Sequence, residues 1–196
     1  MMRNTARFLR EFALHPKRTG AVISSSRILA KAMVQALGEP PPGSVVLELG
    51  PGTGPFTRAL QQHLPHQRHI AIEHNGRFAE LLRQRIPDTT VIEGCASRLP
   101  QILDAAGIAP ENVAGIISGL PLLAFPAALR TDIFAAVAQV LRHGQPMVQF
   151  TYSLRSLRRL CPPAFTLDPC RRVLLNCPPA QVVVMRLAEA GEPVCV

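Results

Sequence analysis

Short apolar runs alternate with segments of helical spacing along most of the chain. An uninterrupted apolar run bounded by polar residues is typical of a strand that is buried on both faces of a parallel sheet. Apolar positions three and four residues apart predict amphipathic helices between these runs. The predicted strands are 45–49, 69–73, 89–94, 113–118 and 146–152, and the predicted helices are 56–64, 78–86, 98–106 and 127–142. This order predicts an α/β fold with a doubly wound, mostly parallel sheet that carries helices on both faces.

The end of the chain breaks this alternation. Two further apolar runs, 171–177 and 180–187, are separated by Pro178 and Pro179. Consecutive strand-like runs with turn-forming residues between them predict an antiparallel pair. We expect this pair to complete the sheet.

The start of the chain is predicted to be helical. The segment EPPPG, at 39–43, is a stiff linker between this helical region and the sheet. Ser24 to Ser26 are predicted to cap a helix that ends at Leu37, before Gly38.

An earlier helix is predicted over the first residues of the chain. At about 100° per residue, Phe8 and Phe12 fall on one broad apolar face, and Arg3, Arg7 and Arg10 fall on the opposite face. A basic amphipathic helix of this kind is typical of a segment that lies in a membrane interface. An ordinary surface helix packed on its own domain would show the same pattern, so the wheel leaves both interpretations open.

The formal net charge of +8 comes almost wholly from arginine, because Lys17 and Lys31 are the only lysines. The basic residues gather in two clusters, residues 1–31 and residues 155–172. The planar fork of arginine forms paired hydrogen bonds with phosphate. The charge therefore favours an anionic partner, either nucleic acid or an anionic membrane surface. A compositional bias toward Arg, Ala and Pro is the alternative explanation.

The cysteines and histidines give little sign of a metal site. None of the five cysteines forms a C-x-x-C pair, which disfavours a zinc ribbon and favours reduced thiols in the cytosol. His63, His66 and His69 recur every three residues but cross Pro65, so a solvated turn is preferred to a metal site. No apolar signal-peptide core follows the basic start. We expect no metal and a cytosolic location.

The run VVLELGPGTGPF, at 45–56, brings three glycines directly after the first predicted strand. In such sheets nucleotide cofactors bind beyond the carboxyl end of this strand. A dinucleotide site needs G-x-G-x-x-G, whereas Gly50, Gly52 and Gly54 follow G-x-G-x-G and Pro55 stands at the place of the last glycine. Glu48 would repel a pyrophosphate but suits a cofactor that carries an ammonium group. The spacing and the acid together indicate S-adenosylmethionine.

Glu73 ends the second predicted strand. A carboxylate there can accept hydrogen bonds from both ribose hydroxyls, as the corresponding acid does in dinucleotide folds. A solvated acid at a strand end is the alternative. The segment 50–54, which we call the glycine loop, favours the cofactor role.

Six sequence blocks occur in one order over most of the chain: FLREF (8–12), TGAVISSSRILAKAM (19–33), VLELGPGTGPFT (46–57), ISGLPLLAFP (117–126), QFTY (149–152) and NCPPA (176–180). Together they resemble bacterial phospholipid N-methyltransferases, which are class I S-adenosylmethionine-dependent enzymes with a Rossmann-like fold. The resemblance implies methyl transfer to the amine of phosphatidylethanolamine and its mono- and dimethyl forms, toward phosphatidylcholine, with S-adenosylhomocysteine as the second product. It also implies a peripheral enzyme on the inner face of the bacterial cytoplasmic membrane. Region 1–38 would bind the membrane and domain 44–196 would carry out methyl transfer.

One expected cofactor contact departs from the family pattern. Such enzymes carry an acid after the third strand for the adenine amino group, and Cys95 stands there in this chain. A thiol is a weak acceptor, so the backbone around Ala96 and Ser97 is expected to hold the adenine instead. The complete set of expected cofactor residues is Glu48, Gly50, Pro51, Gly52, Thr53, Gly54, Glu73, His74, Cys95, Ala96 and Ser118.

The loop after the fourth predicted strand bears on the methyl acceptor. Adenine-methylating enzymes of RNA and DNA carry Asn-Leu-Pro-aromatic here, and the aromatic ring stacks on a flipped base. This chain reads Ser118-Gly119-Leu120-Pro121-Leu122, which lacks that ring. The loop suits an acyl chain or a glycerol backbone better than a base, although its leucines could simply bury the loop.

Three residues are expected at the reacting amine. Backbone carbonyls near Ser118 and Gly119 could orient it, and Tyr152, at the end of the fifth predicted strand, could bind the amine or the lipid phosphate. A tyrosine that covers the sheet edge is the alternative to a role for Tyr152. The residues expected to contact lipid or membrane are Arg3, Arg7, Phe8, Arg10, Phe12, Arg155, Arg158 and Arg159.

Two rival functions stay open. The charge favours an adenine N6-methyltransferase of rRNA or DNA, but the missing aromatic ring disfavours it. A catalytically silent, cofactor-binding membrane adaptor is the other rival, because Cys95 puts the adenine contact in question. The expected partners are an anionic membrane surface and phosphatidylethanolamine rather than nucleic acid.

Overall fold

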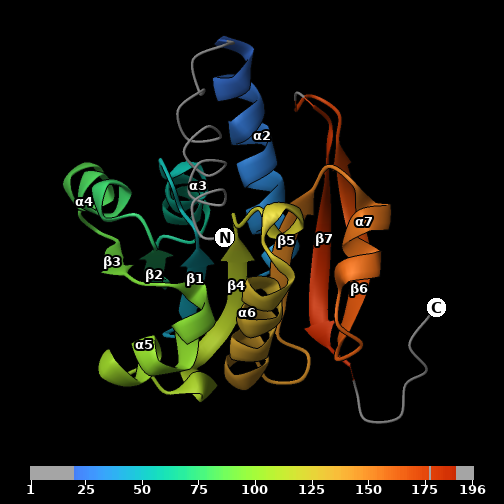
Figure 1. The fold of residues 1–196 in the computed structure, drawn as a ribbon. Helices are drawn as coiled ribbons and strands as arrows, with labels where there is room; N and C mark the ends of the chain where they lie inside the picture. The colour runs from blue at the N-terminus through green and yellow to red at the C-terminus, as the bar shows by residue number, and fades with distance from the viewer. Residues whose placement is uncertain (1–19, 177, 189–196) are drawn as a thin grey trace.

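The computed structural model describes residues 20–176 and 178–188 of the chain, and side chains from Arg27 onward (Figure 1). One seven-stranded sheet runs through it in the order β3-β2-β1-β4-β5-β7-β6. Its five parallel strands are β1 (Val45–Leu49), β2 (Arg68–Glu73), β3 (Thr90–Glu93), β4 (Val113–Ser118) and β5 (Met147–Thr151). Strands β6 (Phe165–Val173) and β7 (Ala180–Leu187) pair antiparallel with each other, and β7 pairs antiparallel with β5. The predicted doubly wound sheet with a terminal antiparallel pair is confirmed.

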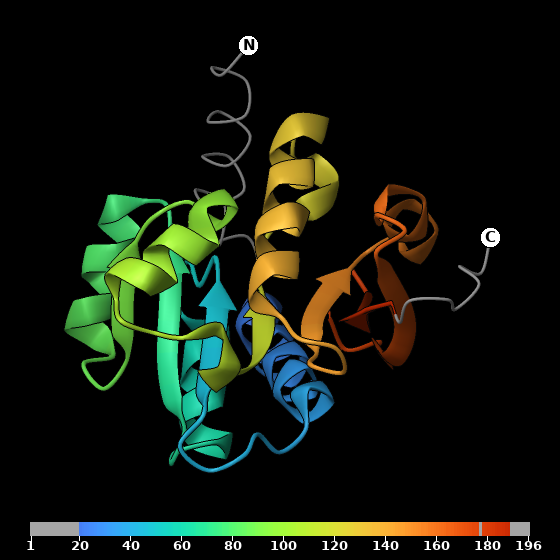
Figure 2. The same ribbon diagram turned by 90° about the horizontal axis from the view of Figure 1, so that it is seen from below.

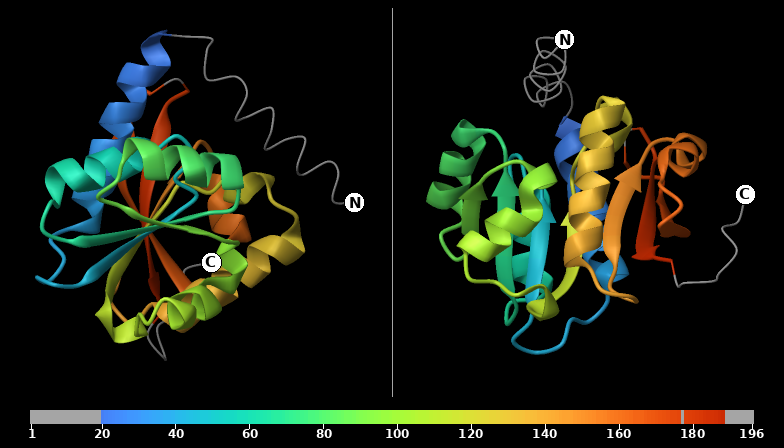
Figure 3. Two further views of the ribbon diagram at one scale, coloured as in Figure 1. Left: turned by 90° about the vertical axis from the view of Figure 1, so that its left-hand side faces the viewer. Right: turned by 60° about the horizontal axis from the view of Figure 1, so that its bottom comes forward.

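Helices cover both faces of this sheet, as Figures 2 and 3 show. The α-helices are α2 (Gly20–Leu37), α3 (Pro55–His63), α4 (Gly76–Arg85), α5 (Leu99–Ala105), α6 (Ala127–Val140) and α7 (Leu154–Leu160). Three short 3-10 helices join them: η2 (Ala96–Arg98), η3 (Pro110–Asn112) and η4 (Leu122–Ala124). Successive side chains of β1 point to opposite faces of the sheet. Leu47 packs toward α5, α6 and α7 on one face, whereas Val46 packs toward α2 and α3 on the other. Helix α4 packs on the α2 and α3 face through Ala71.

The sheet order reverses next to β1. The chain first builds β2 and β3 on one side of β1, and then places β4 and β5 on its other side. Such a switch point opens a crevice at the carboxyl ends of the strands, and ligands bind there in doubly wound folds. The glycine loop after β1 and the loop after β4 therefore meet at the expected binding edge.

Helix α2 packs into the same core as the sheet. Leu29, Met33 and Leu37 are buried against Val46 and Val148. The helix begins at Gly20, so Ser24 to Ser26 lie inside it and the predicted cap at these serines is wrong. Residues 1–19 lie outside the described residues, and the membrane-binding role of region 1–38 stays a prediction. In the described part of the chain, no helix is long and apolar enough to span a bilayer.

The bounds predicted for β6 were also wrong. The sequence predicts a strand over 171–177, whereas β6 begins at Phe165 and ends at Val173. The register explains the difference, because Phe165 pairs with Leu187 and Val173 pairs with Ala180. Leu174 and Leu175 therefore lie in the turn between the two strands, despite their apolar side chains.

Candidate functional site

The glycine loop joins β1 to α3 and brings its backbone close to two neighbours. Gly50, Gly52 and Gly54 all have positive φ, which favours glycine over residues that carry a Cβ. A Cβ on Gly50 would lie 2.7 Å from Leu120 Cδ2, so this glycine permits contact with the loop after β4. A Cβ on Gly52 would meet no atom within 4 Å, so the middle of the loop borders open space that a ligand can enter.

Glu73 lies at the end of β2, beside the middle of the glycine loop. Its Oε2 accepts a 2.9 Å hydrogen bond from the backbone N–H of Gly52, and its Oε1 accepts a 2.8 Å hydrogen bond from the N–H of Asn75. Asn75 also caps α4, because its side chain accepts hydrogen bonds from the N–H groups of Arg77 and Phe78. The carboxylate is thereby fixed in orientation, and each of its oxygens retains a further lone pair. A ribose diol is a fitting donor for these lone pairs.

Glu48 lies near the end of β1 and is 1% exposed. Neither of its carboxylate oxygens has a hydrogen-bond partner. Burial raises the pKa of Glu48 to about 8, and the nearby charge of Glu73 adds to the rise. Thr57, in the first turn of α3, partly opposes this shift of the pKa through its hydroxyl and its backbone N–H, although it does not reach the carboxylate in hydrogen-bond geometry.

Two acids beside one loop decide which ligand suits the site. A buried carboxylate without a partner is costly to ionise and is stabilised by a neighbouring cation. Glu73 would repel a pyrophosphate and suits ribose hydroxyls, whereas Glu48 ionises readily only beside a cation and therefore suits an ammonium group. The residues present therefore fit S-adenosylmethionine, which the glycine spacing predicts.

The end of β3 adjoins this acidic pair. The N–H of Gly94 donates a 2.9 Å hydrogen bond to the carbonyl of Glu73 and holds the two strand ends together. Cys95 is half-buried, and its sulfur accepts a hydrogen bond from the Ser97 hydroxyl at 3.1 Å. Ala96 is buried in the core, whereas His74 is exposed beyond the end of β2. The Ala96 side chain is therefore not available to a ligand, and the cofactor contacts expected of Cys95 and His74 stay predictions.

The loop after β4 presses against the glycine loop. Gly119 donates a 2.8 Å hydrogen bond to the carbonyl of Leu49, and a Cβ on Gly119 would lie 2.6 Å from the carbonyl oxygen of Gly50. The Ser118 side chain is fully buried, and its hydroxyl accepts a hydrogen bond from the Leu120 N–H at 3.4 Å. Only the backbone of Ser118 and Gly119 can therefore face a methyl acceptor in this arrangement.

A row of three aromatic rings leads from the glycine loop to the end of β5. Phe56, in the first turn of α3, lies 5.8 Å from Phe150, and Phe150 lies 5.7 Å from Tyr152, measured between ring centroids. Tyr152 lines a cavity of about 260 Å³ at this end of the sheet. The complete lining is Thr151, Tyr152, Leu154, Arg172, Pro179, Ala180 and Gln181. The expected Tyr152 is thus connected to the glycine loop through Phe150.

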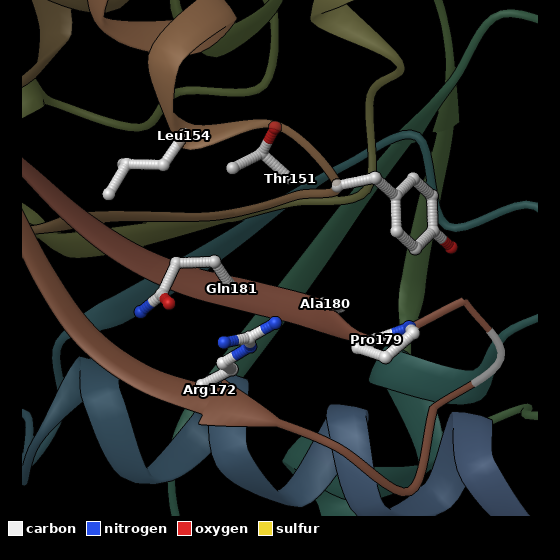
Figure 4. A pocket seen from close by; sticks show the side chains of 7 residues that line it. Thr151, Leu154, Arg172, Pro179, Ala180 and Gln181 are labelled. Carbon is white, nitrogen blue, oxygen red and sulfur yellow. The ribbon is translucent and has the colours of Figure 1, made fainter.

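The cavity also contains residues that the sequence analysis missed. Arg172 of β6 and Gln181 of β7 are register partners, and Figure 4 shows their side chains close together at the cavity. Both residues are far from Tyr152 along the chain. They come together only through the antiparallel register of β5, β7 and β6, which the sequence analysis did not predict. The arginines expected at the lipid, Arg155, Arg158 and Arg159, are exposed on α7 and do not line the cavity.

Other expected residues add less to the site. Pro51 and Thr53 lie in the glycine loop. The expected membrane residues Arg3, Arg7, Phe8, Arg10 and Phe12 lie outside the described residues. Within residues 20–176 and 178–188, no group of three or more His, Cys, Asp or Glu side chains could hold a metal ion.

The sequence has a close relative among known lipid-modifying enzymes. The ornithine lipid N-methyltransferase of Singulisphaera acidiphila is 36% identical to it over 148 residues, which make up 74% of this chain and 76% of the relative. The chain belongs to this family of lipid N-methyltransferases. The predicted membership is thereby confirmed, and S-adenosylmethionine is the methyl donor.

The family of ribosomal RNA adenine dimethylases also matches residues 22–94 of this chain. That range runs from α2 to the end of β3. It contains the glycine loop and Glu73, and it ends before the loop after β4 and the cavity at Arg172. The match therefore concerns the cofactor half of the domain.

Two solved structures share the fold. TrmN from Thermus thermophilus superposes with a TM-score of 0.67 at 19% identity, over 85% of this chain and 52% of that one. Phosphoethanolamine N-methyltransferase 1 from Haemonchus contortus, solved with phosphoethanolamine and S-adenosylhomocysteine, gives a TM-score of 0.65 at 11% identity, over 98% of this chain and 50% of that one. This chain spans about half the length of each. These similarities confirm the Rossmann-like class I methyltransferase fold.

Proposed function

We propose that the protein transfers methyl groups from S-adenosylmethionine to the amine of phosphatidylethanolamine and of its mono- and dimethyl forms, toward phosphatidylcholine. The reaction would take place on the inner face of the bacterial cytoplasmic membrane. The observation that carries the proposal is the cavity lined by Arg172, Gln181 and Tyr152 at the end of β5, joined to the glycine loop through Phe150 and Phe56. A guanidinium in this cavity suits the phosphate that lies a few bonds from the lipid amine.

The chain's own task is to align a neutral amine. The sulfonium of the cofactor supplies an already activated methyl group, and alignment of the two reactants can contribute roughly 7 to 11 kcal/mol. A lipid ammonium has a pKa near about 10, so it must lose a proton before or during transfer. Partial burial of the ammonium lowers this pKa. Backbone carbonyls near Ser118 and Gly119 orient the amine, and Gln149 steadies that loop through a 3.1 Å hydrogen bond to the carbonyl of Leu120.

The loop after β4 argues against a base as the acceptor. Leu122 follows Pro121 and is buried in η4, and Leu123 is partly exposed. The next aromatic residue, Phe125, packs against the core. This loop offers no ring for stacking a flipped adenine. The similarity to the RNA adenine dimethylases, which ends at residue 94, does not extend to this loop.

An ornithine lipid is the second candidate acceptor. The relative at 36% identity is an ornithine lipid N-methyltransferase. An ornithine headgroup also combines an amine with an anionic group, in this case a carboxylate. The Arg172 cavity suits either anion, so the headgroup has to be decided by assay.

Radiolabelled S-adenosylmethionine tests the proposal directly. The full-length protein is incubated with vesicles of phosphatidylethanolamine and phosphatidylglycerol, with vesicles in which ornithine lipid replaces phosphatidylethanolamine, and with ribosomal RNA. We expect label in phosphatidylethanolamine and none in RNA. Label in the ornithine lipid alone would favour the second candidate, and label in RNA without label in lipid would refute a lipid substrate. The Glu73→Ala variant is the inactive control.

A further inference from the structure

The turn between β6 and β7 presents two large apolar side chains to solvent. We call residues 174–176 and 178–179 the β6–β7 tip. Leu174 is 66% exposed and Leu175 is 73% exposed. The other exposed large apolar residues in the described part of the chain, Ile28, Leu123 and Tyr152, are each less than half exposed. Adjacent leucines at such exposure are unfavourable in water, so the tip is a candidate for contact with an apolar phase.

Buried residues at the base of the tip hold its backbone in place. Val173 and Ala180, the last register pair of the hairpin, are both buried, and so is Asn176 within the turn. The Asn176 side chain donates a 2.7 Å hydrogen bond to the carbonyl of Pro178. These contacts hold the turn in place while the two leucines point away from the core.

The tip lies at the ligand-binding end of the sheet. Thr151, the last residue of β5, pairs with Gln181 near the start of β7, so the tip lies beyond the carboxyl end of β5. Pro179 of the tip lines the cavity together with Arg172 and Gln181. Figures 1 and 3 show the hairpin projecting past the sheet beside α2, and Arg171 donates a 3.0 Å hydrogen bond to the side chain of Gln35 in that helix.

The charge around the tip identifies the apolar phase that it fits. Between residues 150 and 188 the sequence has six arginines and one acid, Asp168. That acid pairs with Arg186 at 3.3 Å, and Arg171 and Arg172 precede the two leucines with Val173 between them. Apolar side chains next to arginines suit a bilayer with anionic headgroups, in which leucines reach the acyl chains and arginines contact phosphates.

We propose that the β6–β7 tip inserts into the membrane interface. Leu174 and Leu175 enter the boundary of the acyl chains of a bilayer that contains anionic lipid, and this depth brings the Arg172 cavity to the level of the headgroups. The tip thereby selects the orientation in which a lipid amine can reach the glycine loop. The inference rests on the proposed lipid substrate, and it assigns a membrane contact to a segment that is far along the sequence from the predicted amphipathic helix at the start of the chain.

Fluorescence tests this insertion, because the chain contains no tryptophan. In the full-length Leu175→Trp variant, vesicles of phosphatidylethanolamine and phosphatidylglycerol should shift the indole emission to the blue, and lipids brominated on their acyl chains should quench it. Gln62→Trp is the matched control. Gln62 is exposed one residue before α3 ends, and the chain continues from there to the start of β2, at the amino ends of the parallel strands. Its emission should not change. An unchanged Leu175→Trp emission on vesicles that bind the protein would overturn the inference while leaving the lipid substrate intact. A response to RNA and not to vesicles would overturn it as well.

A second variant separates membrane docking from a defect of the site. Leu174→Ser combined with Leu175→Ser should weaken vesicle binding at least tenfold and raise KM for lipid in vesicles. Its rate on a short-chain phosphatidylethanolamine dispersed as monomers should match that of the unmodified protein. Loss of activity on the dispersed lipid would assign the leucines to the site itself and overturn the inference. If the unmodified protein methylates neither lipid form, the proposed substrate fails together with the inference.

Discussion

The backbone N–H of Gly52 donates a 2.9 Å hydrogen bond to the carboxylate of Glu73. The bond joins the turn after β1 to the end of β2, so it holds the loop and the acid together. The sequence analysis assigned both residues to the cofactor. The structure adds that they support each other.

Replacing Glu73 should therefore weaken the cofactor site. We expect Glu73→Ala to lower the affinity for S-adenosylhomocysteine at least tenfold, about 1.4 kcal/mol, because the diol acceptor and the contact to Gly52 are both lost. Titration calorimetry measures the change. Glu80→Ala is the matched control, since Glu80 is exposed on α4, where it pairs with Arg83 and accepts a hydrogen bond from Gln84 of the same helix. Equal affinities in the two variants would remove Glu73 from the cofactor site.

Gly119 should not tolerate a side chain. A Cβ there would lie 2.6 Å from the carbonyl oxygen of Gly50, and backbone gives way less readily than a flexible side chain. We expect Gly119→Ala to lower the free energy of unfolding by about 1–3 kcal/mol and to abolish methyl transfer. Urea denaturation and the lipid assay measure the two effects. Gly119→Ala with native stability and activity would show that the loops are not in contact.

Glu48 should make the stability of the ligand-free protein depend on pH. The unfolded chain releases its proton near the ordinary value of 4.5, whereas the folded protein holds it up to about pH 8. The folded state therefore binds more protons between these values, and the contribution of Glu48 to stability is lost as the pH rises through about 8. Glu48→Gln should be more stable than the unmodified protein at about pH 8.5, by an amount on the order of a few kcal/mol, and about equal to it at about pH 4.5. Urea denaturation of both proteins at the two pH values tests this, and parallel pH profiles would contradict the raised pKa.

Arg172 should bind the anionic part of the headgroup. We expect Arg172→Gln to raise KM for lipid at least tenfold and to leave S-adenosylhomocysteine affinity unchanged, because the cavity lies on the acceptor side of the site. Arg158→Gln is the matched control on α7. A larger change in KM for Arg158→Gln would support the α7 arginines that the sequence analysis favoured.

The start of the chain should be needed for stable attachment. Because stable anchoring of a peripheral protein takes two signals, deletion of residues 1–15 should abolish flotation with anionic vesicles even though the β6–β7 tip remains. Cofactor affinity should be unchanged. Flotation equal to that of the full-length protein would remove the amphipathic helix from the account.

The sequence predicted the buried parts of the fold well. Strands β1, β4 and β7 have the predicted bounds, because buried strands produce apolar runs that Gly, Pro and Ser terminate. Strand β6 was misplaced because it is an edge strand whose middle is exposed and contains Pro169. The leucines that suggested a strand lie in the turn.

The site was predictable where it depends on strand ends. Glu48 and Glu73 lie near the ends of β1 and β2 and the glycines follow β1, so their strand positions indicate one site, since the carboxyl ends of parallel strands meet at one edge. Arg172 and Gln181 were not predictable, because they reach Tyr152 only through the pairing of β6, β7 and β5. No local pattern in the sequence contains that register.

The most direct test of the central claim is the lipid composition of a bacterium that lacks phosphatidylcholine and expresses this protein. We expect mass spectrometry of its lipid extract to detect methylated forms of phosphatidylethanolamine, and to detect none when the Glu73→Ala variant is expressed. Methylated adenine in the ribosomal RNA, without any methylated lipid, would contradict the account.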